Sequence, residues 1–233
     1  MPSGEGVFYC LMGVPSDSVE ASSRRSLVRG LAVSLAVGAG LASLSPAAGG
    51  RHFTLDSEKS VLTVHTGKAG LFSFAGHEHA IRGTRLRGEV VADNDDLAAS
   101  SVSISIEAAG LSVLAEGESP HDLPQVQAKM VGASFLDVER FAVIAFRSTK
   151  VSGKPAEGAA WDLALEGDLS LHGLTRHLTL PVRVEMSGDT LVAEGKTVLK
   201  QTDFGLTPIT VAGVVKVKDE VSLDYRFVAH EVP

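Results

Sequence analysis

The sequence predicts an all-β fold, a barrel or a sandwich of about eight to ten antiparallel strands, with one short amphipathic helix. Apolar and polar residues alternate through most of the chain after residue 50, which is the pattern of strands with one buried face. The connections between the alternating runs are short, and no strand–helix–strand rhythm is present. One interval, residues 120–141, has a helical period instead.

The two clearest strands are neighbours in the chain and predict a hairpin. Apolar residues alternate with polar ones in both runs: Leu163, Leu165, Leu169 and Leu171 in the first, and Leu178, Leu180, Val182, Val184 and Met186 in the second. About four residues, 173–176, separate the runs, which is the length of a hairpin loop. Similar runs predict further strands at 61–66, 86–92, 102–106, 143–151, 190–199, 209–217 and 221–228.

The helical interval predicts one helix that ends near Gly132. Asp122 followed by Gln125 has the spacing of a capping box, and Pro124 suits the first helical turn. The apolar positions share one helical face, which we expect to be buried over an open barrel end or a sheet edge: Leu123, Val126 and Met130.

Residues 1–47 are predicted to be an export signal peptide. A long uncharged apolar run follows a basic cluster and precedes small residues, which is the order of a secretory signal. We expect cleavage near Ala47 and a periplasmic or secreted protein. Arg24 and Arg25 stand in a segment that resembles the twin-arginine export signal. An ordinary Sec signal and an uncleaved membrane anchor are the two alternatives.

Charge and cysteine content restrict the function of the single domain expected at 48–233. The chain has a net charge of −7, and residues 48–233 contain no lysine or arginine cluster, so we expect no nucleic-acid partner. Its only cysteine is Cys10, so the domain has no thiolate metal site. Neither a Gly-x-Ser-x-Gly elbow nor a glycine-rich phosphate loop is present. We therefore expect no enzyme activity and no cofactor, and we interpret Asp93 to Asp96 as a solvated turn.

Several sequence blocks carry a family resemblance. Their residues are 133–141, 143–149, 167–176, 178–182 and 202–206. In their order and spacing they resemble the YceI-like family, over about Phe53 to Val228. The resemblance implies a lipocalin-like, antiparallel up-and-down β-barrel that holds a polyisoprenoid or another long-chain lipid in its interior.

The composition agrees with an apolar ligand. The chain has only nine Phe, two Tyr and one Trp, so bulky side chains that could plug a barrel are scarce. A barrel of about eight strands is wide enough to be filled by its own side chains or to hold one slender ligand. The first possibility, a filled interior, is the alternative to ligand binding.

We expect an exported lipid-binding protein, with a polyisoprenoid, isoprenoid quinone or fatty-acid-like ligand. The prediction is compatible with transient membrane contact and with a homodimer. The residues expected to contact the ligand are apolar and come mostly from the predicted hairpin: Phe72, Phe74, Met130, Phe135, Leu163, Leu165, Leu169, Leu171, Leu178, Leu180, Val182 and Phe204.

His77 and His79 carry the alternative function, a periplasmic metal-linked or redox-linked protein. On a strand, two residues that are two apart point to one face, a spacing that zinc and copper sites use. His172 and His177 flank the predicted hairpin loop, and their places in the alternation predict that both point to solvent.

Overall fold

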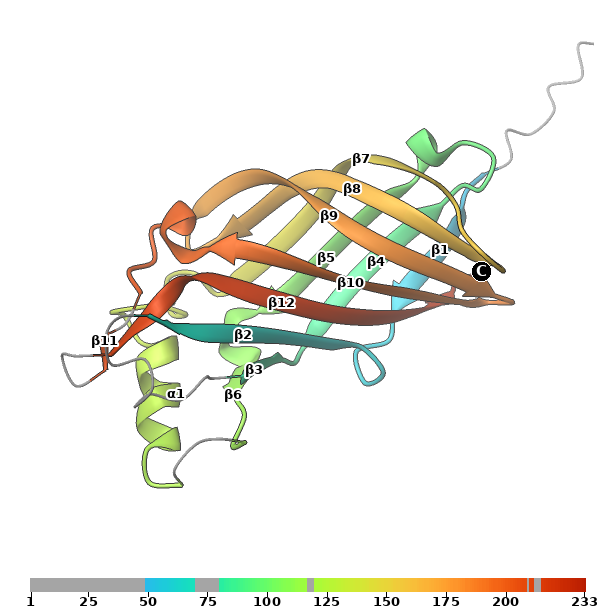
Figure 1. Cartoon of the computed structure of the whole chain (residues 1–233). Coiled ribbons are helices and arrows are strands. Elements are labelled where there is room, and N and C mark those ends of the chain that lie inside the picture. Colours follow the sequence, from blue (N-terminus) through green and yellow to red (C-terminus); the bar gives the residue numbers. More distant parts are fainter. Residues whose placement is uncertain (1–48, 70–79, 117–119, 209, 212–214) are drawn as a thin grey trace, which may run out of the picture. The chain divides into compact units, whose positions relative to one another are not determined.

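A computed structural model describes residues 49–69, 80–116, 120–208, 210–211 and 215–233 (Figure 1). This part contains one α-helix, α1 (Leu123–Val131), and the short helices η2 (Leu97–Ala99), η3 (Ala108–Gly110) and η4 (Gln201–Phe204). Its strands are β1 (Arg51–Leu55), β2 (Val61–Ala69), β3 (Ala80–Gly83), β4 (Leu86–Ala92), β5 (Ser101–Glu107), β6 (Leu111–Val113), β7 (Val143–Pro155), β8 (Ala160–Leu171), β9 (Leu174–Ser187), β10 (Thr190–Lys200), β11 (Thr210–Val211) and β12 (Val215–Glu231).

Eight of these strands form a closed antiparallel ring. Their order is β1-β4-β5-β7-β8-β9-β10-β12, and the ring closes because β1 pairs with β12, with Phe53 opposite Glu231. A closed sheet has no free edge, so every ring strand has a partner on both sides along at least part of its length. The predicted fold class, an antiparallel barrel with one short helix, is confirmed.

The other main strands continue three of the ring strands past a break. In the sheet order β2, β3 and β6 follow β12, with β2 paired to the first part of β12, just as β1, β4 and β5 follow from its last part. At the first break the Ser60 hydroxyl replaces a strand partner: it accepts from the Val228 N–H at 3.0 Å and donates to the Val228 carbonyl at 3.3 Å. The result is an up-and-down meander in which three barrel strands each consist of two pieces.

Helix α1 forms where the periodicity predicts it, and Gly132 caps its carboxyl end. The predicted capping box is wrong. Asp122 has helical dihedral angles, φ −91° and ψ −26°, and its side chain makes no bond to the helix but lies 3.1 Å from His121 Nδ1. The helix is attached to β6 by Gln127, whose amide accepts from Val113 N and donates to the Leu111 carbonyl.

The predicted hairpin exists, but its loop is shorter than expected. Only His172 and Gly173 separate β8 from β9, and both have positive φ, 50° and 75°. Two adjacent left-handed residues make the tight turn that matches the twist of paired strands. Leu174 to Arg176, predicted to be loop, therefore belong to β9.

The C-terminal strands differ from the prediction more than the hairpin does. Residues 215–217 of the first predicted strand and all of the second, 221–228, belong to one strand, β12, and residues 210–211 form the short strand β11. The polar residues Lys218 to Glu220 break the alternation, and there the register against β2 shifts instead of the strand ending.

β1, β3 and β6 were not predicted, because three to five residues are too few to show a period. The predicted turn at Asp93 is confirmed, since its carboxylate accepts from the N–H groups of Asp95 and Asp96.

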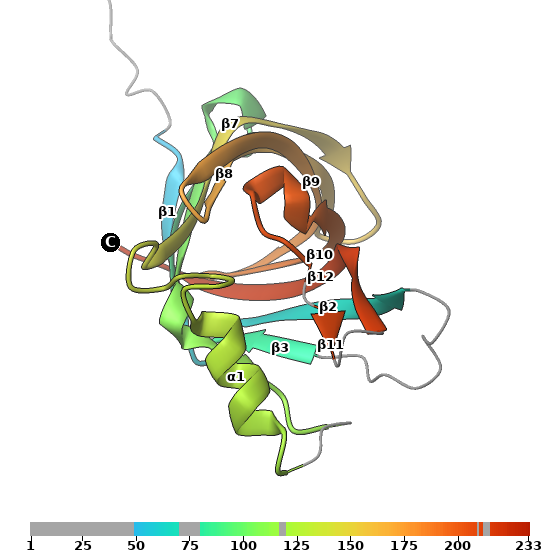
Figure 2. The ribbon, with the colours of Figure 1, turned by 90° about the vertical axis from the view of Figure 1, so that its left-hand side faces the viewer.

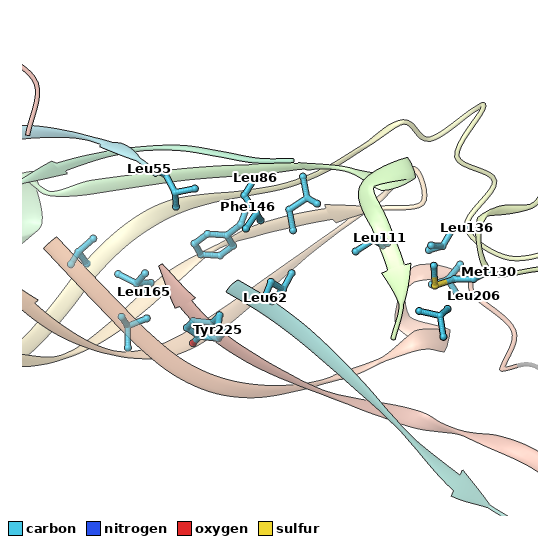
Figure 3. Close-up of a cluster of buried hydrophobic side chains, with 14 residues drawn as sticks. Leu55, Leu62, Leu86, Leu111, Met130, Leu136, Phe146, Leu165, Leu206 and Tyr225 are labelled. Carbon is cyan, nitrogen blue, oxygen red and sulfur yellow. The ribbon is translucent and has the colours of Figure 1, made fainter. Parts of the chain in front are cut away.

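Apolar side chains pack in two clusters. The larger lies inside the barrel and reaches α1 through Met130 and Leu136, as Figure 3 shows. The smaller consists of Phe53, Leu191 and Ala229. Phe53 is 1% exposed and lies beside the β1–β12 closure, so this second cluster packs the end of the barrel where the ring closes.

Candidate functional site

The barrel encloses an apolar cavity of about 280 Å³. Side chains from all eight ring strands line it, together with residues of β2, β3 and β6. Met130, Phe204 and Leu206 border it at the end covered by α1 and η4, and Leu97 borders it beside η2. Figure 2 looks into the first of these ends, where η4 lies in the opening of the barrel.

The alternation correctly identifies the inward positions of the predicted hairpin. Ten of the twelve expected ligand contacts line the cavity: Met130, Phe135, Leu163, Leu165, Leu169, Leu171, Leu178, Leu180, Val182 and Phe204. The other two, Phe72 and Phe74, lie outside the described residues. The cavity also has aromatic lining residues that were not predicted, Phe146, Trp161, Tyr225 and Phe227. Three of them occupy inward positions of predicted runs, so the same period-2 pattern could have found them.

Charge is nearly absent from the cavity. Among the described lining residues, Asp93 beside η2 and Lys200 at the end of β10 are the charged ones. An ionised head group inside the barrel would therefore lose its hydration without finding a partner, which costs several kcal/mol. The arrangement suits an apolar chain whose polar end remains at the surface.

Tyr225 carries the buried hydroxyl group of the wall. Its hydroxyl donates to the Pro181 carbonyl at 2.6 Å, and burial raises the pKa of Tyr225 to about 12. The ring lies over Gly195, its partner in the register between β12 and β10. A Cβ on Gly195 would be 2.6 Å from the ring and 2.3 Å from the Pro181 oxygen, so only glycine fits there.

The free energy of unfolding should fall when Tyr225 ionises. Because the folded pKa lies above the ordinary value of 10.0, the folded protein holds the phenol proton more tightly than the unfolded chain does. This contribution is fully present below pH 10 and is lost as the pH rises from about 10 to about 12. Urea unfolding at about pH 9 and about pH 11.5 should show a loss in the parent that Tyr225→Phe lacks. Equal losses in both proteins would contradict the assignment.

The structure confirms one of the predictions made for the histidines and contradicts another. His77 and His79, which carry the alternative metal or redox function, lie outside the described residues. His177 faces solvent as predicted, with Nδ1 2.9 Å from the Asp168 carboxylate. The prediction for His172 is wrong: it is half-buried and packs edge-on against Phe141 at 4.5 Å between ring centroids. It lies in the turn at positive φ, so strand alternation does not apply to it.

The described residues contain no group of three His, Cys, Asp or Glu side chains arranged to hold a metal ion. None of their helices has both the length and the apolar character required to span a bilayer.

Solved structures share this architecture. Burkholderia cenocepacia BcnA has 20% identity and a TM-score of 0.56, with 75% of this chain and 98% of that one covered. A polyisoprenoid binding domain from Saccharophagus degradans, implicated in plant cell wall breakdown, has 13% identity and a TM-score of 0.54, with 77% and 98% covered. A mutant Campylobacter jejuni YCEI protein has 12% identity and a TM-score of 0.50, with 66% and 85% covered. At these identities the likeness shows a shared fold.

Sequence comparison identifies the family. None of the curated proteins compared with the chain matches it. The family model described as the YceI-like domain matches residues 53–229, which include all eight ring strands except the first residues of β1 and the last of β12. The match covers most of the chain and agrees with the closed barrel and its single helix, so the protein belongs to the YceI-like family.

Proposed function

We propose that the protein is an exported binding protein that holds a long-chain apolar molecule in its barrel. The molecule would be a polyisoprenoid, an isoprenoid quinone or a fatty-acid-like lipid. The observation that carries the proposal is the apolar cavity lined from every strand of a closed ring. Family membership and the fold shared with a polyisoprenoid binding domain support it.

The burial of the inward leucines favours a ligand over a filled interior. Leu163, Leu169, Leu171, Leu178 and Leu180 face the cavity but are only partly buried. Side chains in a close-packed core leave no such free surface, because protein interiors are packed like organic crystals. Each methylene group that a ligand buries against this surface contributes roughly 0.8 kcal/mol. A chain of about ten carbons therefore gains about 8 kcal/mol before ordering costs.

A binding function also fits the chemistry of the wall better than catalysis does. The lining is composed mostly of Leu, Val, Ile and Phe, and its two charged residues stand at opposite ends. Catalysis of a hydrolytic or transfer reaction needs a nucleophile, an acid or a base within reach of the substrate. The proposal is therefore a carrier or a sequestering protein.

Export is proposed from the sequence of residues 1–47. The basic segment, the uncharged run and the small residues before Ala47 follow the order of a signal peptide. The absence of cysteine from 48–233 means that the barrel requires no disulfide in an oxidising compartment.

One preparation tests both parts of the proposal. The protein recovered from outside the cytoplasm of its own cells should release a long-chain apolar molecule into organic solvent, detected by mass spectrometry. Replacing Arg24 and Arg25 with lysine should retain the chain in the cytoplasm, because the twin-arginine route requires both arginines. A folded, exported protein whose extract contains no apolar molecule would refute the binding function. Unchanged export of the double variant would assign the chain to the Sec route.

A further inference from the structure

The ring has a long gap in its pairing between β9 and β10. The two strands pair only where Arg183–Ser187 faces Thr190–Glu194, although β9 begins at Leu174 and β10 continues to Lys200. Each strand remains paired on its other side, β9 with β8 and β10 with β12. Figure 1 shows the two strands together near the C-terminus and apart toward η4. We call the space between β9 residues 174–181 and β10 residues 196–200 the β9–β10 split.

Three residues explain why the pairing stops. Pro181 lies two residues before Arg183, the β9 residue at which pairing with β10 begins. It has no N–H to donate to β10. Its carbonyl accepts from the Tyr225 hydroxyl at 2.6 Å instead of from a strand. Gly195 leaves the space through which the tyrosine reaches it. The end of the split is thus fixed by residues of three different strands.

The split leads into the cavity. Leu178 and Leu180 on the β9 side and Thr197 and Leu199 on the β10 side all line it. Lys200 borders the cavity at the same place, and its ammonium group can donate hydrogen bonds. Main-chain groups of Thr179 share the edge of β9 with those of Pro181, because strand residues two apart face the same neighbour. An apolar chain and a polar end group would both find suitable partners.

Helix η4, at the wide end of the split, is attached mainly to one side. Gln201 Nε2 donates to the Lys218 carbonyl at 2.7 Å, and Thr202 donates to the Asp219 carboxylate through N at 2.9 Å and Oγ1 at 2.7 Å. Toward β9, the polar contact found among the described residues is His172 Nδ1 with the Phe204 carbonyl, at 3.3 Å. The polar contacts therefore hold η4 on β12 more than on β9.

The opposite end of the barrel is fastened. Arg51 Nε donates to the Glu231 carboxylate at 2.9 Å, and another guanidinium nitrogen donates to the Gly188 carbonyl at 2.6 Å. These bonds connect β1, β12 and the β9–β10 turn above the packed cluster of Phe53 and Leu191. An apolar chain that passed beside the β9–β10 turn would have to break them.

We propose that the β9–β10 split is the mouth through which the apolar chain enters the cavity and at which its polar end stays. This inference rests on the proposed function. The presence of a cavity alone does not show by which path a ligand enters it.

Bulky labels can block each end in turn. In a Cys10→Ser background, Thr179→Cys and Val198→Cys place one exposed thiol on either side of the split, and Asn94→Cys places an exposed thiol at the η2 end as the matched control. Each variant is coupled to a maleimide carrying a large polyethylene glycol chain. Melting temperature before and after coupling checks that the fold is intact. The association rate of cis-parinaric acid, which fluoresces in apolar surroundings, is then measured by stopped flow.

Coupling at position 179 or 198 should slow association at least about tenfold relative to the uncoupled variant, because the label covers the mouth while the wall is unchanged. Coupling at position 94 should leave the rate unchanged. Slowing by the label at 94 alone, equal slowing by all three, or slowing by none would overturn the inference. Failure of the unlabelled protein to bind the probe would instead refute the proposed function.

Discussion

Replacing Leu180 with tryptophan should remove the bound apolar molecule while the ligand-free protein melts within a few degrees of the parent. Leu180 lies on β9, faces the cavity and is only partly buried, so the indole can occupy space that a ligand otherwise holds. In a filled core the same enlargement would cause strain of about 1–3 kcal/mol. For a domain of this size, that strain lowers the melting temperature by roughly 2–4 °C for each kcal/mol.

The measurement has two parts, mass spectrometry of the organic extract and calorimetry of the ligand-free protein. Ser222→Trp is the matched control, because Ser222 is exposed on β12 and should change neither result. The binding function would be contradicted by a Leu180→Trp variant that melts well below the parent while the parent yields no extractable lipid.

Replacing Phe53 with alanine should lower the free energy of unfolding by about 3–5 kcal/mol, the range found for large aromatic side chains in cores. Phe53 is 1% exposed and packs with Leu191 and Ala229 where β1 closes the ring against β12. The Arg51 guanidinium carbon also lies 5.0 Å from the centre of its ring. The substitution therefore leaves a void at the closure and removes a support of the arginine that fastens it.

Chemical denaturation of Phe53→Ala beside His52→Ala tests this expectation. His52 is the exposed neighbour on β1, so its replacement should stay within about 0.5 kcal/mol of the parent. A loss below about 1 kcal/mol for Phe53→Ala would be too small for a packed core residue. It would show that this end of the barrel is loose and would remove the contrast with the β9–β10 split.

The strands and helix of this protein were predictable because their signals are local. Two-residue alternation identifies the inward leucines of β8 and β9, and a helical period identifies α1 with Met130 on its buried face. The family resemblance comes from blocks of contiguous residues for the same reason. The local signal became ambiguous only in short segments, such as β3, and where polar residues interrupt a continuous strand, as Lys218 to Glu220 do in β12.

The amino-acid sequence by itself therefore determined which residues form the longer strands of the barrel and which side chains of the predicted hairpin face inward. Only the tertiary structure decided where that wall closes and where it stays open. The closure joins Phe53 to Glu231, and the split depends on Pro181, Gly195 and Tyr225, which meet from three strands. Such contacts join residues far apart in the chain, and a period measured along the chain carries no information about which distant residues become neighbours.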